Sequence, residues 1–498
     1  MSFAVAAGDR LTADAAAEVL RAGGNAVDAA IAGALTACVA EPALASLLGG
    51  GFLMIREPSG RVGVLDFFTQ TPRRKARPGD ADLRAVEYGD AGRAVHIGAG
   101  SIATPGVPRG LSLAHERLGL TPFRELAAPA AELASQGAPL APYQADALAR
   151  IAAIVKADPA ALSIFGDGAE PLKAGALYRN PALADVIETY AREGDRFCHE
   201  GEVAAALISL NGGHLSALDL RRYQAVWRAP MEERRGGARL FLNPPPALGG
   251  ALIALALRLI DHDAGPADLA RAFAAAARAR QETGIDDDPA AGALHLLAPD
   301  LVTRYRRELA GRKTAITGTT HISVIDRRGM GAALTLSNGA GCGLIAPGTG
   351  IMPNNMLGEE HPTGEDPTEW TPDTRLSSMM TPMALDWPNG AFAMLGAGGS
   401  GRIRTALAQV AAHLLDRGMR LEEAIAAPRL HAEAWPEAEF EDGFRDDERA
   451  LLIAAFPEAR AWPAPSAAFG GVHAAARGAR GAVEACGDPR RGGAVVTG

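Results

Sequence analysis

The chain has 498 residues, of which 48% are hydrophobic and only 5% aromatic, and a formal net charge of −9. This length allows two to four ordinary domains or one large intertwined fold. The acidic balance, with no basic run interleaved with aromatic residues, argues against nucleic-acid binding. The 58 glycines predict a fold in which backbone segments approach one another closely.

Metal and membrane functions are also poorly supported. The four cysteines lie far apart without a C-x-x-C pair, and His199-Glu200 lacks the second histidine of H-E-x-x-H, so we expect no metal. The N-terminus has no basic region before an apolar stretch, and no apolar run is long enough and free enough of charge to span a bilayer. These features predict a soluble, cytoplasmic protein.

The first elements predicted along the chain are two helices. The alanine-rich stretch 12–22 ends at Gly23-Gly24, as helices often do. Asn25 then caps a second helix over 26–39, with Asp28 in its first turn, where the helix dipole favours a negative charge. Because this second helix is almost entirely apolar, we expect it to be buried.

A hairpin and a long helical region follow. Residues 47–55, which contain three consecutive glycines, are expected to pair with residues 62–68. Residues 101–310 have mostly helical patterns, interrupted by a strand near 239–242. The polar segment 311–318 has no periodicity and predicts an exposed connector, where a backbone cut would not unravel a core.

A second hairpin is predicted after this connector, with strands around 322–325 and 332–336. It begins with Gly318-Thr319-Thr320. If the Gly318–Thr319 bond is cut, Thr319 carries its hydroxyl beside its own α-amine, which is the arrangement of an activated N-terminal threonine nucleophile. The alternative is a strand that merely starts with two threonines.

A glycine-rich segment, Gly396-Ala397-Gly398-Gly399-Ser400-Gly401, lies between a predicted strand and a predicted helix over 402–417. Its spacing fits G-x-G-x-x-G, so a nucleotide-binding oxidoreductase is one alternative. A dinucleotide fold needs a second parallel strand that ends in an acidic residue about 20 positions later, and the sequence instead continues as helix over 422–427. We therefore favour a turn whose N–H groups face an oxyanion.

The hydroxyl pair Ser377-Ser378 follows a polar loop over 358–375 and either caps a turn or lines a pocket. Beyond residue 427 we expect loops and short strands.

Nine short motifs occur in order over essentially the whole chain, and together they carry more weight than any one alone. They are Gly23-Gly24-Asn25-Ala26-Val27-Asp28, Gly49-Gly50-Gly51-Phe52, Pro105-Gly106-Val107-Pro108, Pro244-Pro245-Pro246, Thr319-Thr320-His321, Pro347-Gly348-Thr349-Gly350, Leu376-Ser377-Ser378-Met379, Gly398-Gly399-Ser400 and Asp488-Pro489-Arg490-Arg491. The ordered set resembles the γ-glutamyltransferases (glutathione hydrolases), a family of N-terminal-nucleophile hydrolases.

The resemblance implies an α+β fold of four αββα layers, with two stacked antiparallel sheets flanked by helices. It implies a proenzyme that cleaves itself between Gly318 and Thr319 into a large-subunit region, 1–318, and a small-subunit region, 319–498. These regions would form one intertwined fold that acts on a small-molecule amide without a cofactor. No nucleic-acid or membrane partner is implied, and a higher oligomer is compatible with the resemblance.

The resemblance also implies roles for individual residues. Thr319 would be the nucleophile, and Ser337 would stand where the family has a threonine hydrogen-bonded to it. Gly398 and Gly399 would supply the oxyanion N–H groups. Ser377 and Ser378 would hold the carboxylate end of the donor.

The sequence departs from the family where the γ-glutamyl group is gripped. The arginine that binds its α-carboxylate falls on Phe68, an asparagine on Gly339, a glutamine on Met356, and the aspartate that binds the α-amine on Glu359. Losing the arginine removes two charge-assisted hydrogen bonds, for which Arg73 or Arg74 is a candidate replacement.

We therefore expect an amidohydrolase or acyltransferase whose donor need not be glutathione. One alternative is an acylase with a non-glutamyl donor, whose acyl pocket Phe68 and Met356 would line. Another is an uncleaved, non-catalytic relative that acts as a binding protein.

Overall fold

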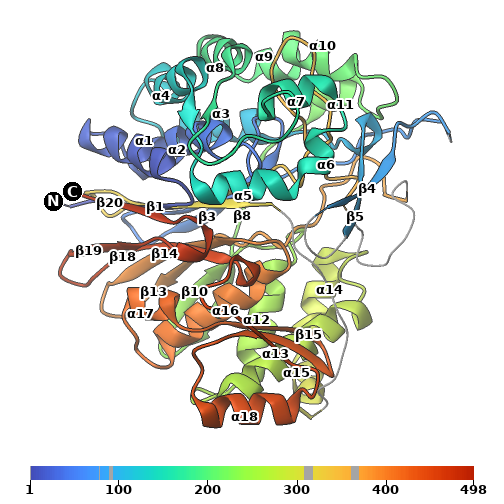
Figure 1. Cartoon of the computed structure of the whole chain (residues 1–498). Helices are drawn as coiled ribbons and strands as arrows, with labels where there is room; N and C mark the ends of the chain where they lie inside the picture. Colours follow the sequence, from blue (N-terminus) through green and yellow to red (C-terminus); the bar gives the residue numbers. More distant parts are fainter. Residues whose placement is uncertain (1, 78, 89–92, 308–317, 360–368) are drawn as a thin grey trace.

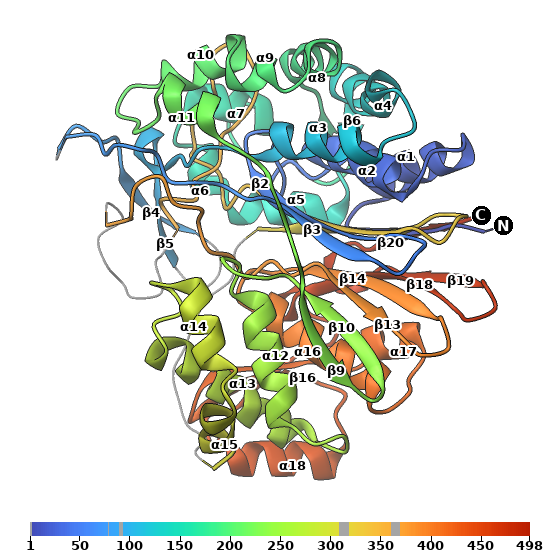
Figure 2. The ribbon, with the colours of Figure 1, turned by 180° about the vertical axis from the view of Figure 1, so that it is seen from behind.

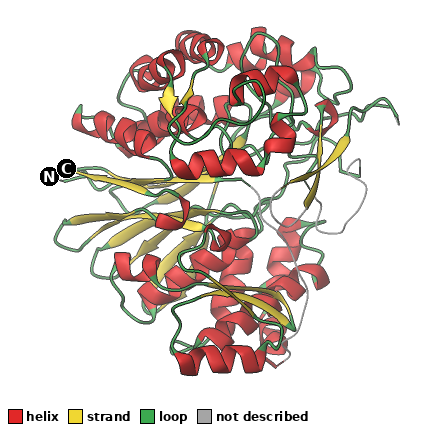
Figure 3. Cartoon of the chain, viewed as in Figure 1, coloured by secondary structure: helices red, strands yellow, loops and turns green. Residues whose placement is uncertain are grey.

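The computed structural model describes residues 2–77, 79–88, 93–307, 318–359 and 369–498. Two antiparallel sheets lie face to face at the centre, and helices cover the outer face of each sheet (Figure 1 and Figure 3). The four layers expected from the sequence are therefore present. Among the described residues, no helix is both long and apolar enough to cross a membrane.

The first sheet has seven strands and includes both ends of the chain, which lie side by side (Figure 1). In spatial order its strands are β20 (Ala494–Thr497), β1 (Ala4–Ala7), β11 (Thr320–Ile325), β12 (Gly331–Ser337), β2 (Gly50–Arg56), β3 (Val62–Phe67) and β8 (Val226–Arg228).

The second sheet has six strands, and the chain crosses to it between β8 and β9 (Figure 2). In spatial order these strands are β19 (Val483–Cys486), β18 (Gly471–Arg477), β14 (Phe392–Gly398), β13 (Met383–Asp386), β10 (Ala238–Leu242) and β9 (Met231–Arg235). Three smaller sheets consist of β4 (Arg84–Tyr88) and β5 (Arg93–Ile97), of β6 (Ala138–Pro139) and β7 (Leu177–Tyr178), and of β15 (Leu430–Ala434), β16 (Glu437–Glu441) and β17 (Arg460–Trp462).

The helices divide between the two outer layers (Figure 1). The layer over the first sheet contains α1 (Arg10–Arg21), α2 (Ala26–Ala40), α3 (Val107–Leu118), α4 (Phe123–Gln136), α5 (Pro142–Arg150), α6 (Ala152–Val155), α7 (Pro159–Phe165), α8 (Pro181–Glu193), α9 (Arg196–His199), α10 (Glu202–Ile208) and α11 (Ala217–Arg222). The layer under the second sheet contains α12 (Gly249–Leu259), α13 (Pro266–Glu282), α14 (Pro289–Leu296), α15 (Pro299–Arg307), α16 (Arg402–Leu415), α17 (Leu421–Ala426) and α18 (Asp446–Ala455). Three 3-10 turns are η1 (Ala99–Ser101), η2 (Ala467–Phe469) and η3 (Pro489–Arg491).

Several local predictions are confirmed and others are wrong. The buried second helix α2 begins with the expected cap, in which Asn25 and Asp28 bond each other's backbone N–H groups. The region 101–310, expected to be mostly helical, contains many short helices, such as α5 and α6. The region after residue 427, expected to be loop and short strand, contains α18. The connector 311–317 and residues 360–368 of the predicted loop 358–375 lie outside the described residues.

Strand β11 is buried on both faces, and its side chains alternate between the two layers. Ile322 and Val324 belong to the apolar cluster around α2, where the Ile322 side chain meets the surface of Gly33. His321 faces the other way and lies against Gly396 of β14, where any side chain would collide with the imidazole ring. This period-two alternation also sets the faces on which Thr319 and Thr320 lie.

The glycine-rich segment at 396–401 is not a dinucleotide-binding unit. The strand that precedes it, β14, is antiparallel to both of its neighbours, β13 and β18. The next strand along the chain, β15, belongs to a separate small sheet. The parallel strand that a dinucleotide fold requires is therefore absent beside β14, and the oxidoreductase alternative is wrong.

Asp28 offers a test of how the helical layer is assembled. Its buried carboxylate accepts hydrogen bonds from the backbone N–H groups of Asn25 and Leu120 and from the hydroxyl of Thr121. We expect Asp28→Ala to lower the free energy of unfolding by about 2–4 kcal/mol, because these donors would be left buried without partners. Denaturant unfolding measures the loss.

The control for this test is Asp14→Ala. Asp14 is partly exposed and pairs with Arg10 on the surface of α1, so we expect little change. Equal losses in the two variants would contradict this account of Asp28.

Candidate active site

Thr319 lies at the head of β11 and is only 5% exposed. Its carbonyl oxygen packs against Gly398, the last residue of β14, where a β-carbon would collide with that oxygen. Only glycine permits this contact between the ends of two strands that belong to different sheets. Thr319 and the glycine turn therefore lie side by side.

The turn after β14 has an unusual backbone. Gly399 has φ of +130° and Ser400 has φ of +50°, and Ser400 is one of two non-glycine residues with positive φ among those described. Such strained residues tend to occur at functional sites. The turn leads directly into α16, so the positive end of a helix dipole lies behind it.

A positively charged side chain that the sequence analysis missed lies against this turn. Arg491 is 5% exposed, and its guanidinium nitrogens lie 3.5 and 3.3 Å from where β-carbons of Gly398 and Gly399 would be. No carboxylate forms an ion pair with Arg491 among the described residues, and its Nη2 donates a 3.4 Å hydrogen bond to the carbonyl of Ala467. The turn therefore has the electrostatic character of an anion site.

The Ser337 hydroxyl contacts the peptide bond before Thr319. Its Oγ donates a 2.7 Å hydrogen bond to the carbonyl oxygen of Gly318 and accepts one of 3.1 Å from the backbone N–H of Gly339. A hydrogen bond to this carbonyl draws electron density from its carbon. Ser337 is thus positioned to make the Gly318–Thr319 bond more open to attack.

Glu359 lies near the same peptide bond. Gly339 has φ of +66°, and a β-carbon there would collide with the amide oxygen of Asn355 and lie 3.0 Å from a carboxylate oxygen of Glu359. The space where the family has an asparagine side chain is therefore filled by other groups. Gly339 also packs through its carbonyl on Gly318, so Glu359, Ser337 and the predicted cleavage site form one neighbourhood.

Apolar side chains occupy the position of the expected glutamyl clamp. Phe68 is buried and stacks on Phe52 with ring centroids 5.4 Å apart, and Met356 belongs to the same apolar cluster. The two arginines that are candidates to replace the lost one lie in different surroundings. Arg73 pairs with Asp373 at 2.7 Å, and Arg74 is exposed.

Arg375, which the sequence analysis also missed, joins the two predicted substrate-binding segments. It donates hydrogen bonds to the carbonyl of Phe68 and to the hydroxyl of Tyr223, and it pairs with Asp66 at 3.5 Å. The signal in the sequence was an arginine immediately before Leu376-Ser377-Ser378. It holds this segment beside Phe68.

The two serines that follow Arg375 are half-buried. The Ser378 hydroxyl accepts a 3.1 Å hydrogen bond from the backbone N–H of Met380, so it caps a turn. The backbone carbonyl of Ser378 accepts hydrogen bonds from Leu248 and Gly249 at the start of α12. Both hydroxyls therefore sit on a segment that is fixed on two sides.

His321, two residues after Thr319, is occupied by structural hydrogen bonds. Its ring nitrogens lie 2.8 Å from the hydroxyl of Thr335 and 2.9 Å from that of Ser323. Burial holds the pKa of His321 well below its usual value, with a further contribution from His473. Because both ring nitrogens of His321 are already hydrogen-bonded and the ring is neutral, another group must act as the base for Thr319.

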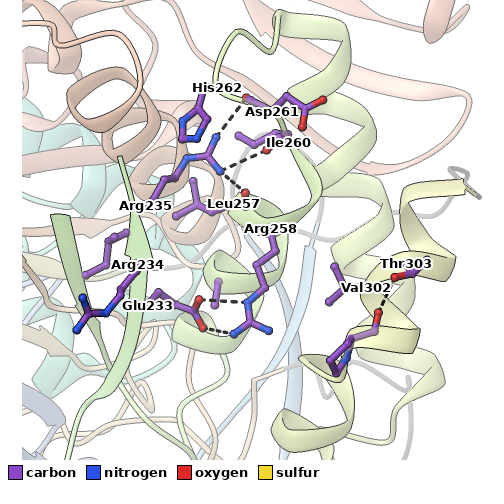
Figure 4. A pocket seen from close by; sticks show the side chains of 13 residues that line it. Glu233, Arg234, Arg235, Leu257, Arg258, Ile260, Asp261, His262, Val302 and Thr303 are labelled. Carbon is purple, nitrogen blue, oxygen red and sulfur yellow. Dashed lines mark hydrogen bonds and ion pairs between the residues drawn. The ribbon is translucent and has the colours of Figure 1, made fainter. Parts of the chain in front are cut away.

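A separate cavity of about 480 Å³ lies between β9, α12 and α15 (Figure 4). Two of the arginines that line it are paired: Arg258 with Glu233 at 2.6 Å and Arg235 with Asp416 at 2.7 Å. None of the residues predicted for catalysis lines it. In the described part of the chain, no group of three or more His, Cys, Asp or Glu side chains is placed to hold a metal ion.

Known proteins share both the sequence pattern and the fold. A model of the gamma-glutamyltranspeptidase family matches residues 12–498. The chain is 30% identical to Acylase ACY 1 proenzyme of Pseudomonas sp. (strain V22), covering 89% of this chain and 85% of that protein. It is 28% identical to the glutathione hydrolase proenzyme of Escherichia coli (strain K12), covering 90% and 84%.

A solved structure extends the comparison to the fold. The cephalosporin acylase from Bacillus halodurans matches with a TM-score of 0.85 over 99% of this chain and 95% of that one, at 23% identity. The two chains therefore share the αββα fold.

The contact at Gly398 can be tested by adding one methyl group. We expect Gly398→Ala to lower the free energy of unfolding by about 1–3 kcal/mol, because the methyl must displace the backbone of Thr319. Gly478→Ala is the control, since its β-carbon would have no neighbour closer than 3.7 Å. Denaturant unfolding of both variants measures the difference. A Gly398→Ala variant as stable as wild type would contradict the close contact between Gly398 and the Thr319 backbone.

Proposed function

Because the chain belongs to the γ-glutamyltranspeptidase family of N-terminal-nucleophile hydrolases, we propose that it is a proenzyme that cleaves itself before Thr319 and then uses Thr319 to cleave amides. The observation that carries this proposal is the position of Thr319 between the Gly398 turn and the Ser337 hydroxyl. An anion-binding turn and a polarised carbonyl are what the two reactions need.

The pairing of the strands supports a cut at this position. The proposed regions 1–318 and 319–498 are interleaved, since β11 pairs with β1 and β12 pairs with β2. The flanking strands β1 and β2 come from the region before the cut, and β11 and β12 between them come from the region after it. Cleavage of one peptide bond would therefore leave both central ladders intact, and the two parts would remain one folded unit.

Self-cleavage would proceed by transfer of the acyl group of Gly318. The Thr319 hydroxyl attacks the Gly318 carbonyl carbon while the Ser337 hydroxyl donates to its oxygen. The C–N bond then breaks, its nitrogen takes the proton of the hydroxyl, and an ester joins Gly318 to Thr319. Water hydrolyses this ester, giving a carboxylate at Gly318 and a free α-amine at Thr319.

Turnover would use the groups that cleavage releases. The neutral α-amine of Thr319 takes the proton of its own hydroxyl, which attacks the amide carbonyl of the substrate. The resulting oxyanion faces the N–H groups of Gly398 and Gly399, next to the charge of Arg491. The amine of the substrate leaves with the proton, and water or an acceptor amine then takes the acyl group from the threonine.

The donor we favour is an amide whose acyl chain is apolar. Phe68 stands where a guanidinium would grip a γ-glutamyl α-carboxylate, and nearby Arg73 and Arg375 are paired with carboxylates. Similarity to an acylase proenzyme also supports this class of donor. A γ-glutamyl donor is the second candidate, because Glu359 lies beside the cleavage site and retains the negative charge that would bind an α-amine.

Self-cleavage is tested with two variants of the active site. We expect Thr319→Ala to remain one chain, because the attacking hydroxyl is lost. Ser337→Ala should be cut about 10- to 1,000-fold more slowly, as expected when one donor to a reacting carbonyl is removed. Denaturing gels over time and N-terminal sequencing of the smaller fragment give the rates and the cleavage position.

The control for these variants is Thr319→Ser, which keeps the hydroxyl and should still be cut. A Thr319→Ala protein that matures into two fragments would refute the proposal. So would wild-type protein that stays intact.

The donor is tested with chromogenic amides that share one leaving group. We expect simple acyl anilides to be hydrolysed with a higher kcat/KM than γ-glutamyl-p-nitroanilide, because Phe68 takes the place of the guanidinium that would bind the α-carboxylate. The Thr319→Ala protein provides the blank. A clear preference for the γ-glutamyl compound would instead establish the second candidate.

A further inference from the structure

Glu41 is an isolated charge in an apolar part of the sequence. It is the single charged residue between Asp28 and Arg56, and it directly follows the last residue of α2. In the structure it is fully buried, and none of the ion pairs among the described residues includes it. A buried carboxyl without a cation is costly, so its retention requires a physical reason.

The Glu41 carboxyl is hydrogen-bonded to β11 on the face of the strand that points to the helical layer. One of its oxygens accepts a 2.5 Å hydrogen bond from the hydroxyl of Thr320, and the other accepts one of 2.8 Å from the hydroxyl of Thr12 in α1. Gly8 completes the contact, since a β-carbon there would lie 2.7 Å from both Glu41 and Thr320. Three segments of the chain thus meet at this carboxyl.

Thr320 is the residue next to the proposed nucleophile. Consecutive residues of a strand point to opposite faces, so Thr320 points to the helical layer and Thr319 to the other sheet. Fixing the Thr320 side chain therefore fixes the backbone from which the amine and hydroxyl of Thr319 project.

The surroundings of Glu41 favour its neutral form. Burial, and to a smaller extent the nearby carboxyl of Asp9, raise the pKa of Glu41, and hydrogen bonds from Thr320, Thr12 and Gln144 lower it, with a net rise from 4.5 to about 8. The pKa of Asp9 is itself raised to about 6, mainly by burial. The Cys38 thiol in α2 also lies close, and burial raises its pKa to about 12, so it stays neutral.

We propose that Glu41 is a positioning residue for Thr319, which in its neutral form orients the nucleophile through Thr320 and on ionisation places an uncompensated negative charge behind the reacting oxyanion. This inference rests on the proposed function. An anion behind the strand opposes the negative charge that develops at the Gly398 turn. Ionised Glu41 therefore slows acyl transfer, and turnover falls at alkaline pH.

The test is the pH profile of kcat/KM on an anilide substrate between pH 6 and 10. Wild type should lose about tenfold as Glu41 ionises, the size of effect that an unscreened charge produces over several ångströms in a protein. Glu41→Gln should abolish this alkaline fall, since its amide cannot ionise. Asp9→Asn should move the fall to lower pH, because it removes the neighbouring charge that keeps Glu41 protonated while the asparagine still caps α1.

Two further variants separate positioning from folding. Glu18→Gln removes an exposed carboxylate of α1 and should follow the wild-type profile. Glu41→Ala removes the acceptor for both threonine hydroxyls, so we expect kcat to fall at every pH, and Glu41→Gln should recover most of that loss. A Glu41→Gln enzyme with the wild-type alkaline fall would overturn the inference.

Unfolding measurements provide a readout that does not need turnover. Glu41 is neutral in the folded state up to about pH 8, whereas in the unfolded chain it ionises above its ordinary value of 4.5. Folding therefore loses stability as pH rises from 4.5 to 8, and Glu41→Gln should gain stability relative to wild type across that window. No gain would overturn the inference.

Failure of the proposed function can be distinguished from failure of the inference about Glu41. It would appear as wild-type protein that is not cut before Thr319, whatever Glu41 does. Cut and active wild type together with an unaltered Glu41→Gln profile would reject only the role of Glu41.

Discussion

At the head of β11, the backbone of Thr319 and the backbone of Gly398 touch with no side chain between them. The rest of the site depends on this contact. It brings the end of a strand in one sheet onto the start of a strand in the other, and it places the turn at Gly399 and Ser400, both with positive φ, next to Thr319. Gly396 and Gly470 have the same role on either side, since a β-carbon at Gly396 would collide with His321 and one at Gly470 would lie 3.0 Å from the Gly398 carbonyl.

Buried polar groups hold β11 from both of its faces. His321 and Ser323 bond each other between the sheets, and Ser323 also bonds the carbonyl of His473. On the opposite face Thr320 bonds Glu41. Because a buried polar group without a partner costs about 1–3 kcal/mol, each of these bonds opposes a slip or rotation of the strand. The threonine is therefore presented by a rigid support, which a nucleophile needs if its geometry is to be reproducible.

In the region expected to bind substrate, acidic and basic side chains are paired with one another. Asp66 forms ion pairs with Arg228 at 2.8 Å and with Arg375, so these protein groups neutralise the Asp66 charge. A charge-assisted hydrogen bond contributes about 1.5–3 kcal/mol, which corresponds to roughly tenfold to a hundredfold in affinity. With Phe68 in place of an arginine, a substrate carboxylate would forgo that contribution, whereas an apolar chain would lose nothing. This difference is the physical basis for favouring an acylase-type donor.

Local physical chemistry allowed the sequence by itself to predict much of this protein. A cap at Asn25, an apolar helix after it, hairpins with period-two patterns and glycines beside a strand end are all short-range features. Their order along the chain identified the family and hence the four layers, and it led to the proposals for the nucleophile and the turn. Only the tertiary structure decided which distant residues meet. Glu41 and Thr320 are 279 positions apart, and Arg375 reaches Phe68 from 307 positions away. Such contacts depend on strand register and on how two sheets stack, and no local pattern encodes either.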